Sequence, residues 1–89
     1  MNKRVKELEK GINNKEVFRK IQTVAIRLKD SFDYDYTDKN ATIDSFYYYC
    51  QGLYEFNIID AKMFNDLTYT FNEEIYKLMR IKEETKLYE

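Results

Sequence analysis

The sequence contains no histidine, no tryptophan and no proline, and it has one cysteine and two glycines. The lack of histidine together with a single cysteine excludes zinc modules, disulfide scaffolds and imidazole-based catalysis. No apolar run approaches the roughly 20 residues that cross a bilayer, and no signal-peptide segment follows Met1. An unpaired cysteine without an export signal is typical of a reducing compartment, so we expect a cytoplasmic protein that makes no membrane contact.

The near absence of helix breakers favours an α-helical chain. Proline costs about 3 kcal/mol inside a helix and glycine about 1 kcal/mol, so a sequence that avoids both can be helical over most of its length. Its 89 residues are enough for one domain. We therefore expect a single all-α domain over residues 1–89.

Charge is balanced overall but divided along the chain. The 15 basic and 16 acidic side chains give a net charge of −1, which excludes a polyanion-coating protein of the histone kind. However, residues 1–29 hold nine basic and three acidic side chains, a local charge of +6, whereas residues 30–89 hold six and thirteen, a local charge of −7. The protein should therefore be dipolar, with a basic N-terminal third.

Apolar spacing at the helical period predicts three amphipathic helices, at 15–32, 42–57 and 61–82. Their apolar stripes are Val17, Phe18, Ile21, Val24, Ala25, Leu28 and Phe32; Ile43, Phe46, Tyr47, Cys50, Leu53 and Tyr54; and Phe64, Leu67, Phe71, Ile75 and Leu78. The link between the second and third helices is short, with Asp60 as a good N-cap, and this forces an antiparallel helical hairpin. The fold that follows is a small three-helix bundle, in which the basic helix 15–32 packs on the hairpin.

Two segments outside these helices are less regular. Residues 2–10 can form a short extra helix, and Gly11 followed by Asn13-x-x-Glu16 resembles a helix end and a capping box. We therefore expect a break at 11–14 and a weakly attached segment 1–14, with a continuous kinked helix as the alternative. Residues 33–41 are rich in turn formers and should form an acidic loop, with Asn40 or Thr42 capping the next helix.

The acidic loop invites comparison with a calcium site. Asp33, Asp35, Thr37, Lys39 and Asp44 match positions 1, 3, 5, 7 and 12 of an EF-hand loop. However, Asp38 replaces the required glycine, Asn40 replaces an aliphatic residue, and Asp44 replaces the bidentate glutamate. We therefore expect no bound metal. The loop is either a solvated linker or, with Tyr34, Tyr36, Asp33, Asp35 and Asp38, an edge that binds a basic partner.

The remaining reactive groups do not form a catalytic constellation. Cys50 lies on an apolar helix face without a neighbouring cation, which is typical of a buried structural thiol. The adjacent pairs Glu73-Glu74 and Glu83-Glu84 diverge by about 100° on a helix and so fit a solvated face. No glycine-rich phosphate loop is present. We expect no catalytic residues, no cofactor and no enzymatic activity.

Aromatic residues are the most informative feature, at 17% of the chain with nine Tyr and six Phe. Consecutive Tyr47, Tyr48 and Tyr49 sweep about 200° of a helix, so they cannot all be buried on one side. Two stripes lie beside the predicted core, namely Ser45, Tyr49, Gly52 and Phe56, and Asn65, Tyr69, Asn72 and Tyr76. Tyrosine is common at protein interfaces. The residues that we expect to bind a partner are Tyr48, Tyr49, Phe56, Tyr69 and Tyr76; intramolecular packing is the alternative.

The basic third of the chain offers a second interpretation. Lys15, Arg19, Lys20, Arg27 and Lys29 surround the outer face of the helix 15–32 and could contact phosphates. No helix-turn-helix arrangement is recognisable. The alternative that we favour is that this helix packs beside the acidic part of the chain, within the fold or across a homodimer.

The leading functional hypothesis is a non-enzymatic protein-interaction module that binds a protein partner. Excess Lys, Asn, Ile and Tyr is typical of the AT-rich genes of phages and mobile elements, where small anti-CRISPR and anti-restriction proteins without catalytic motifs occur. By analogy with proteins of that type, and without a matching family motif, we expect an accessory or inhibitor protein whose Asp series imitates DNA phosphates. The alternative is a small DNA-binding accessory factor. A homodimer that buries Ile26 or the face of Tyr69 and Tyr76 fits the small core.

Overall fold

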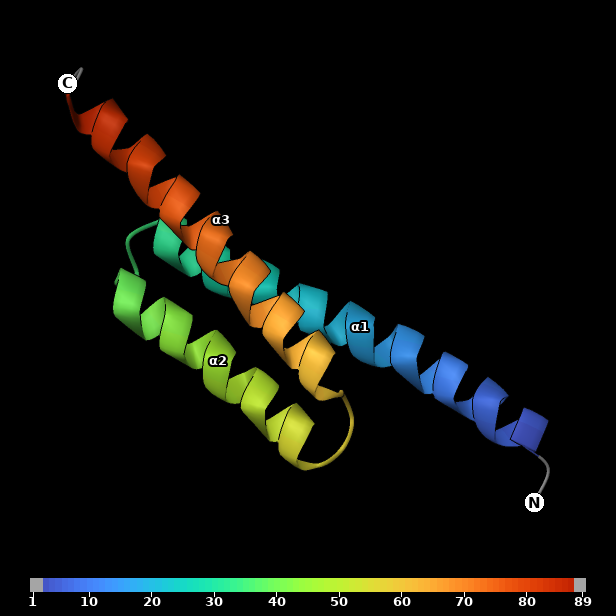
Figure 1. The fold of residues 1–89 in the computed structure, drawn as a ribbon. Coiled ribbons are helices and arrows are strands. Elements are labelled where there is room, and N and C mark those ends of the chain that lie inside the picture. The colour runs from blue at the N-terminus through green and yellow to red at the C-terminus, as the bar shows by residue number, and fades with distance from the viewer. Residues whose placement is uncertain (1–2, 88–89) are drawn as a thin grey trace.

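The protein consists of three helices. The computed structural model describes the backbone of residues 3–87 and the side chains of residues 15–85. Helix α1 spans Lys3–Asp33, α2 spans Lys39–Glu55 and α3 spans Ala61–Leu87, and no strand occurs within residues 3–87. The chain passes up, down and up again, so that α2 runs antiparallel to both α1 and α3 (Figure 1). The predicted all-α three-helix bundle is confirmed.

The helices are offset along their axes, which makes the molecule a rod of 63 × 19 × 19 Å. The first half of α1 extends beyond the α2–α3 connection, and the last part of α3 extends beyond the opposite end of the bundle (Figure 1). The first residue of α1 and the last residue of α3 therefore lie far apart, and the three helices overlap only in the middle of the rod.

The core lies where all three helices overlap. Phe46 of α2 is 1% exposed and stacks on Phe71 of α3, with 4.2 Å between ring centroids and an interplanar angle of 22°. The buried hydrophobic residues are Ile21, Phe32, Phe46, Cys50, Ile59, Phe71 and Ile75. All except Phe32 and Ile59 lie well inside a helix, and all except Ile59 belong to the predicted stripes. The stripes therefore face one another as amphipathic helices require.

The first connection, residues 34–38, is closed by backbone hydrogen bonds and a side-chain cap. The N–H of Tyr36 donates to the carbonyl of Ser31 at 2.8 Å, and Asp35 adopts a positive φ of 63°. This is the Schellman arrangement that commonly ends a helix, with Asp tolerating the left-handed conformation. The carboxylate of Asp38 then accepts from the N–H of Ala41 at 2.7 Å and starts α2.

The second connection repeats this construction. The N–H of Ile58 donates to the carbonyl of Leu53 at 2.9 Å, and Asn57 adopts a φ of 59°. The carboxylate of Asp60 accepts from the N–H of Met63 at 2.8 Å, which confirms Asp60 as the cap of α3. Five residues thus reverse the chain, as the predicted hairpin requires.

The structure corrects three local predictions. Helix α1 continues through Gly11, so the expected break at 11–14 is absent and the helix expected at 15–32 is only its second half. A single glycine costs a helix about 1 kcal/mol, which a helix of 31 residues tolerates. Asp38, and neither Asn40 nor Thr42, caps α2, which therefore begins at Lys39.

Thr42 does not cap α2, as the sequence suggested, but forms hydrogen bonds inside its first turn. Its side chain is 1% exposed, and its hydroxyl donates to the carbonyl of Asp38 at 2.7 Å. Because that hydrogen is used, the hydroxyl of Thr37 is the donor across the 3.0 Å contact between the two threonines. Thr42 therefore stabilises the first turn of α2 from inside the bundle.

Candidate interaction surfaces

Four exposed tyrosines of the hairpin define what we call the tyrosine surface: Tyr47 and Tyr48 on α2, and Tyr69 and Tyr76 on α3. Their exposed fractions range from 43% to 66%. Tyr69 and Tyr76 are seven residues apart and so share one side of α3. Glu74 pairs with Lys29 of α1 and lies about 160° around the helix from Tyr76. This side of α3 therefore faces away from α1.

The tyrosines on α2 are held by contacts between rings. Tyr47 packs edge-on against Phe64, with centroids 5.3 Å apart and an angle of 69°. Tyr48 packs edge-on against Tyr47 at 5.6 Å and 84°. Edge-to-face arrangements of this kind are favourable by about 0.5–1.5 kcal/mol each. The two rings are therefore positioned before any partner binds.

The tyrosines on α3 have polar neighbours. The ammonium of Lys39, at the start of α2, lies 5.3 Å from the centre of the Tyr76 ring, within the range of a cation–π interaction. A hydrogen bond to Glu73 and the negative charge of that carboxylate raise the pKa of Tyr69. Tyr69 thus keeps its proton, and its exposed ring carries a hydrogen-bonding tip.

The stripe predicted on α2, which contains Tyr49, Gly52 and Phe56, is only partly exposed to a partner. Tyr49 is half-buried and packs against the core, so it is not an open contact residue. Phe56 is 79% exposed, the most open phenylalanine among the described side chains. A methyl group in place of the Gly52 hydrogen would meet no atom within 4 Å outside the adjoining turns of α2, so the helix surface is open at this position. Phe56 and Gly52 remain accessible, whereas Tyr49 contributes to stability.

The acidic loop exposes both of its rings, but its carboxylates are partly used by the fold. Tyr34 and Tyr36 are 69% and 81% exposed. Asp38 caps α2, and Asp35 forms an ion pair with Lys82 at 2.8 Å. Asp33 has an exposed side chain at the last residue of α1. The loop is therefore a structured connection with two outward rings.

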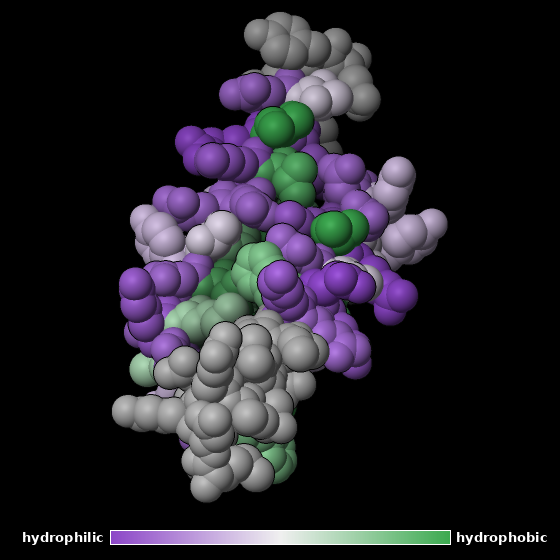
Figure 2. Space-filling model, turned by 90° about the vertical axis from the view of Figure 1, so that its right-hand side faces the viewer, coloured by the Kyte–Doolittle hydropathy of each residue, from purple (hydrophilic) through white to green (hydrophobic). Residues whose placement is uncertain are grey.

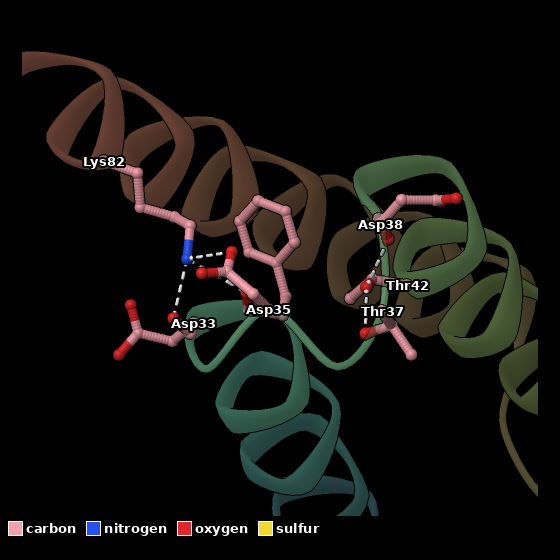
Figure 3. A network of polar contacts seen from close by, with 7 residues as sticks. Asp33, Asp35, Thr37, Asp38, Thr42 and Lys82 are labelled. Atoms are coloured by element: carbon pink, nitrogen blue, oxygen red, sulfur yellow. Dashed lines mark hydrogen bonds and ion pairs between the residues drawn. The ribbon is translucent and has the colours of Figure 1, made fainter. Parts of the chain in front are cut away.

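Lys82 of α3 closes the end of α1, a role that the sequence did not predict. Its ammonium donates to the carbonyls of Asp33 at 2.6 Å and Phe32 at 3.2 Å, and it also contacts the carboxylate of Asp35 (Figure 3). The last carbonyls of a helix lack partners within the helix and carry partial negative charge. A cation from the third helix therefore satisfies the end of the first.

Replacing Lys82 with Met should lower the free energy of unfolding by about 1–2 kcal/mol. The change keeps the aliphatic stem but removes the charged donor from two carbonyls and one carboxylate. Urea denaturation followed by circular dichroism measures the effect. Lys77→Met is the matched control, because Lys77 is an exposed residue of the same helix. An equal loss in both variants would contradict a capping role for Lys82.

The basic face of α1 is open over part of its length. Lys29 pairs with Glu74 of α3, so this residue joins the basic helix to the acidic part of the chain. The other predicted contacts, Lys15, Arg19, Lys20 and Arg27, are exposed. None of these four forms an ion pair with the side chains described for residues 15–85. Among these five basic residues, an ion pair with the acidic part of the chain, as the favoured interpretation expects, is therefore formed by Lys29 alone.

The thiol of Cys50 is inaccessible. It has no exposed surface, and burial raises its pKa from 9.0 to about 11. The position in the centre of α2 is the predicted one for a structural thiol, and a protonated buried thiol is a poor nucleophile. Within the described part of the chain, no three acidic or cysteine side chains are grouped as a metal site.

Apolar side chains outside the core are scattered. Ile26 does not belong to the apolar stripe of α1 and is 54% exposed. With Leu78 it lines a shallow depression edged by Lys29, Asp30 and Asp33. On the face drawn in Figure 2, hydrophobic side chains form separate patches among hydrophilic ones. Among the helices described, none is long and apolar enough to cross a membrane.

No protein family model, no curated protein and no solved structure matches this chain.

Proposed function

We propose that this protein is a non-enzymatic interaction module that binds a protein partner through the tyrosine surface. The observation that carries the proposal is the exposure of Tyr69 and Tyr76 on a side of α3 that faces away from α1. Tyrosine offers a large contact area and a hydrogen-bonding tip at a small entropic cost. Such rings are frequent among the residues that dominate binding energy.

The arrangement of the surface supports this proposal. Contacts with Phe64 and Lys39 hold Tyr47 and Tyr76, so little side-chain freedom is lost on binding. Exposed Tyr34 and Tyr36, with Asp33, extend the candidate contacts to the loop end of the bundle. The role of an accessory or inhibitor protein of a phage or mobile element stays a prediction within this proposal.

Replacing both Tyr69 and Tyr76 with Ala should weaken partner binding at least tenfold while leaving the helices intact. Loss of a central tyrosine typically costs more than about 1 kcal/mol of binding energy, and each tenfold change in affinity is about 1.4 kcal/mol. The measurement is affinity capture from the source cell, followed by calorimetric titration of the captured protein with each variant. Circular dichroism should show unchanged helicity, because both side chains are exposed.

A double Tyr→Phe variant at the same positions is the matched control for ring area. It should keep most of the affinity and lose only the contribution of the two hydroxyls. If the double Ala variant binds the captured protein as tightly as the natural chain, the tyrosine surface is not the binding site.

The second candidate function is DNA binding through α1. It is favoured by the exposure of Lys15, Arg19, Lys20 and Arg27 without ion-pair partners among the side chains of residues 15–85. Phosphate contacts of this kind weaken steeply as salt is raised. A salt-dependent mobility shift of duplex DNA would favour this function, and no shift at low salt would eliminate it.

A further inference from the structure

The side of α2 that points away from the core carries a stripe of polar and aromatic side chains. At 100° per residue, Asp44, Tyr48 and Glu55 lie about 160–180° around the helix axis from the buried Phe46. All three are exposed. Their spacing places them on one helix face, together with a glutamine between the last two. We call this set the outer stripe of α2: Asp44, Tyr48, Gln51 and Glu55.

The ring of Tyr48 is held in place and stays open to solvent. It is 66% exposed and packs edge-on against Tyr47, with centroids 5.6 Å apart and an angle of 84°. Tyr47 in turn packs on Phe64 of α3. Two rings at nearly right angles form a corner that a cation can enter, as in aromatic cages. The ammonium of Lys39 already lies 5.3 Å from the centre of the Tyr76 ring, so the same kind of contact occurs elsewhere on the tyrosine surface.

The charged side chains of the outer stripe are both carboxylates. The only basic residue of α2, Lys39, is not part of the stripe and lies over a ring of α3. Asp44 forms no ion pair with the side chains described for residues 15–85, and Glu55 accepts a hydrogen bond from Gln51 at 3.2 Å. Asp44 precedes Tyr48 by four residues, which makes the two side chains neighbours on the helix surface. The stripe therefore combines an aromatic face with a carboxylate that can still pair with a cation.

Gly52 lies beside Tyr48, four residues further along α2. Glycine weakens a helix because its backbone loses the most freedom on folding. The fold does not require a glycine here, since Gly52 has no positive φ and an added Cβ would meet no atom within 4 Å outside the adjoining turns of α2. Its effect is on the surface, where the missing side chain leaves one flank of Tyr48 uncovered and lets another molecule approach closely.

We propose that the outer stripe of α2 receives an arginine side chain of the protein partner, with the guanidinium on the Tyr48 ring and beside the Asp44 carboxylate. Because the proposed function places a partner at the tyrosine surface, this contact rests on that function and names the partner's chemistry. Arginine fits better than lysine, since its planar guanidinium stacks on a ring and can donate two parallel hydrogen bonds to one carboxylate. Glu55, roughly 16 Å further along the helix, offers a second carboxylate to the same basic segment.

The test is an NMR titration of the full chain with a capped, alanine-based helical peptide that carries arginine at every fourth position. The ring signals of Tyr48 and the amide signals of residues 44–55 should shift. The same peptide with lysine should bind more weakly, and the same peptide with glutamine should cause no shift. Asp44→Asn and Tyr48→Leu should each raise the dissociation constant of the arginine peptide about two- to fivefold, and together about tenfold.

Gly52→Gln should change stability and binding in opposite directions. Glutamine is a much better helix former than glycine, so the urea concentration at the midpoint of unfolding should rise. The new side chain should cover the flank of Tyr48 and raise the dissociation constant of the arginine peptide at least about twofold. A role of Gly52 in folding alone would not weaken binding in a more stable protein.

Two matched controls separate the contact from general effects of charge and shape. Tyr48→Phe keeps the ring and should bind the arginine peptide as the natural chain does. Glu84→Gln removes an exposed carboxylate from the part of α3 that extends beyond the bundle, so it should leave the affinity nearly unchanged (Figure 1).

Several results would overturn the arginine site. They are the absence of any shift at about 10 mM arginine peptide, an arginine peptide that binds no more tightly than its lysine or glutamine counterpart, and an Asp44→Asn variant that behaves like Glu84→Gln. The proposed function is tested separately with the captured partner. If that partner requires Tyr69 and Tyr76 but binds Asp44→Asn as tightly as the natural chain, the proposed function stands and the arginine site does not.

Discussion

Replacing Phe46 with Ala is expected to lower the free energy of unfolding by about 3–5 kcal/mol. Phe46 is 1% exposed and stacks on Phe71 at a centroid distance of 4.2 Å. It belongs to the hydrophobic core of the bundle, in the helix that packs on both others. Truncation to Ala removes the stacked ring and leaves a cavity that rigid neighbours fill only in part.

This loss is large relative to the stability of a small domain. Domains are typically stable by about 5–15 kcal/mol, and the bundle has a thin core along a rod 19 Å wide. The variant should therefore unfold at a much lower urea concentration, in a transition followed by circular dichroism.

Phe56→Ala is the matched control for that measurement. It makes the same chemical change at the end of the same helix, but on a side chain that is 79% exposed. Surface substitutions usually change stability by less than about 0.5 kcal/mol. Comparable losses in the two variants would contradict the position of the core.

The core could be predicted from sequence because it depends on periodicity. Ile21, Phe46, Phe71 and Ile75 each lie on an apolar stripe whose helical spacing is visible in the residues alone. The hairpin also followed from the short link before Asp60. Ile59 was missed, because its burial depends on how the connection folds back and not on a helical period.

The ends of helices were harder to predict, since several residues near each end could serve as a cap. Asp38 prevails over Asn40 and Thr42 because the chain reverses at Asp35, whose left-handed conformation follows the end of α1. Gly11 suggested a helix end, but the cost of one glycine is smaller than the cost of ending and restarting a helix.

The contacts of the candidate surfaces could be foreseen only in part. The exposure of Tyr69 and Tyr76 follows from their place beside the stripe of α3. By contrast, Tyr49 packs on the core. Lys82 lies 49 residues beyond Asp33, whose carbonyl it binds, and no local sequence pattern predicts a contact at that separation. A lysine on the buried side of a predicted helix was the one available signal.

The stability of the protein should fall between pH 9 and pH 11 because of Cys50. In the folded chain burial raises the pKa of this thiol from 9.0 to about 11. Above pH 9 the unfolded chain releases the thiol proton while the folded chain retains it, so unfolding becomes more favourable as the pH rises. Each pKa unit corresponds to about 1.4 kcal/mol, so the full loss is about 3 kcal/mol and is complete near pH 11.

Cys50→Ala isolates this contribution, because alanine does not titrate and fits in the space of the thiol. Urea denaturation across the range from neutral pH to about pH 11 should give a difference in unfolding free energy between the two proteins that is constant below pH 9. Above that pH the difference should change in favour of the variant, since the tyrosines and lysines that titrate in this range are common to both proteins. A difference that stays constant throughout would mean that the thiol ionises as easily in the folded chain as in water. Cys50 would then have to contact solvent, which its position between Phe46 and Leu53 in a closed bundle does not permit.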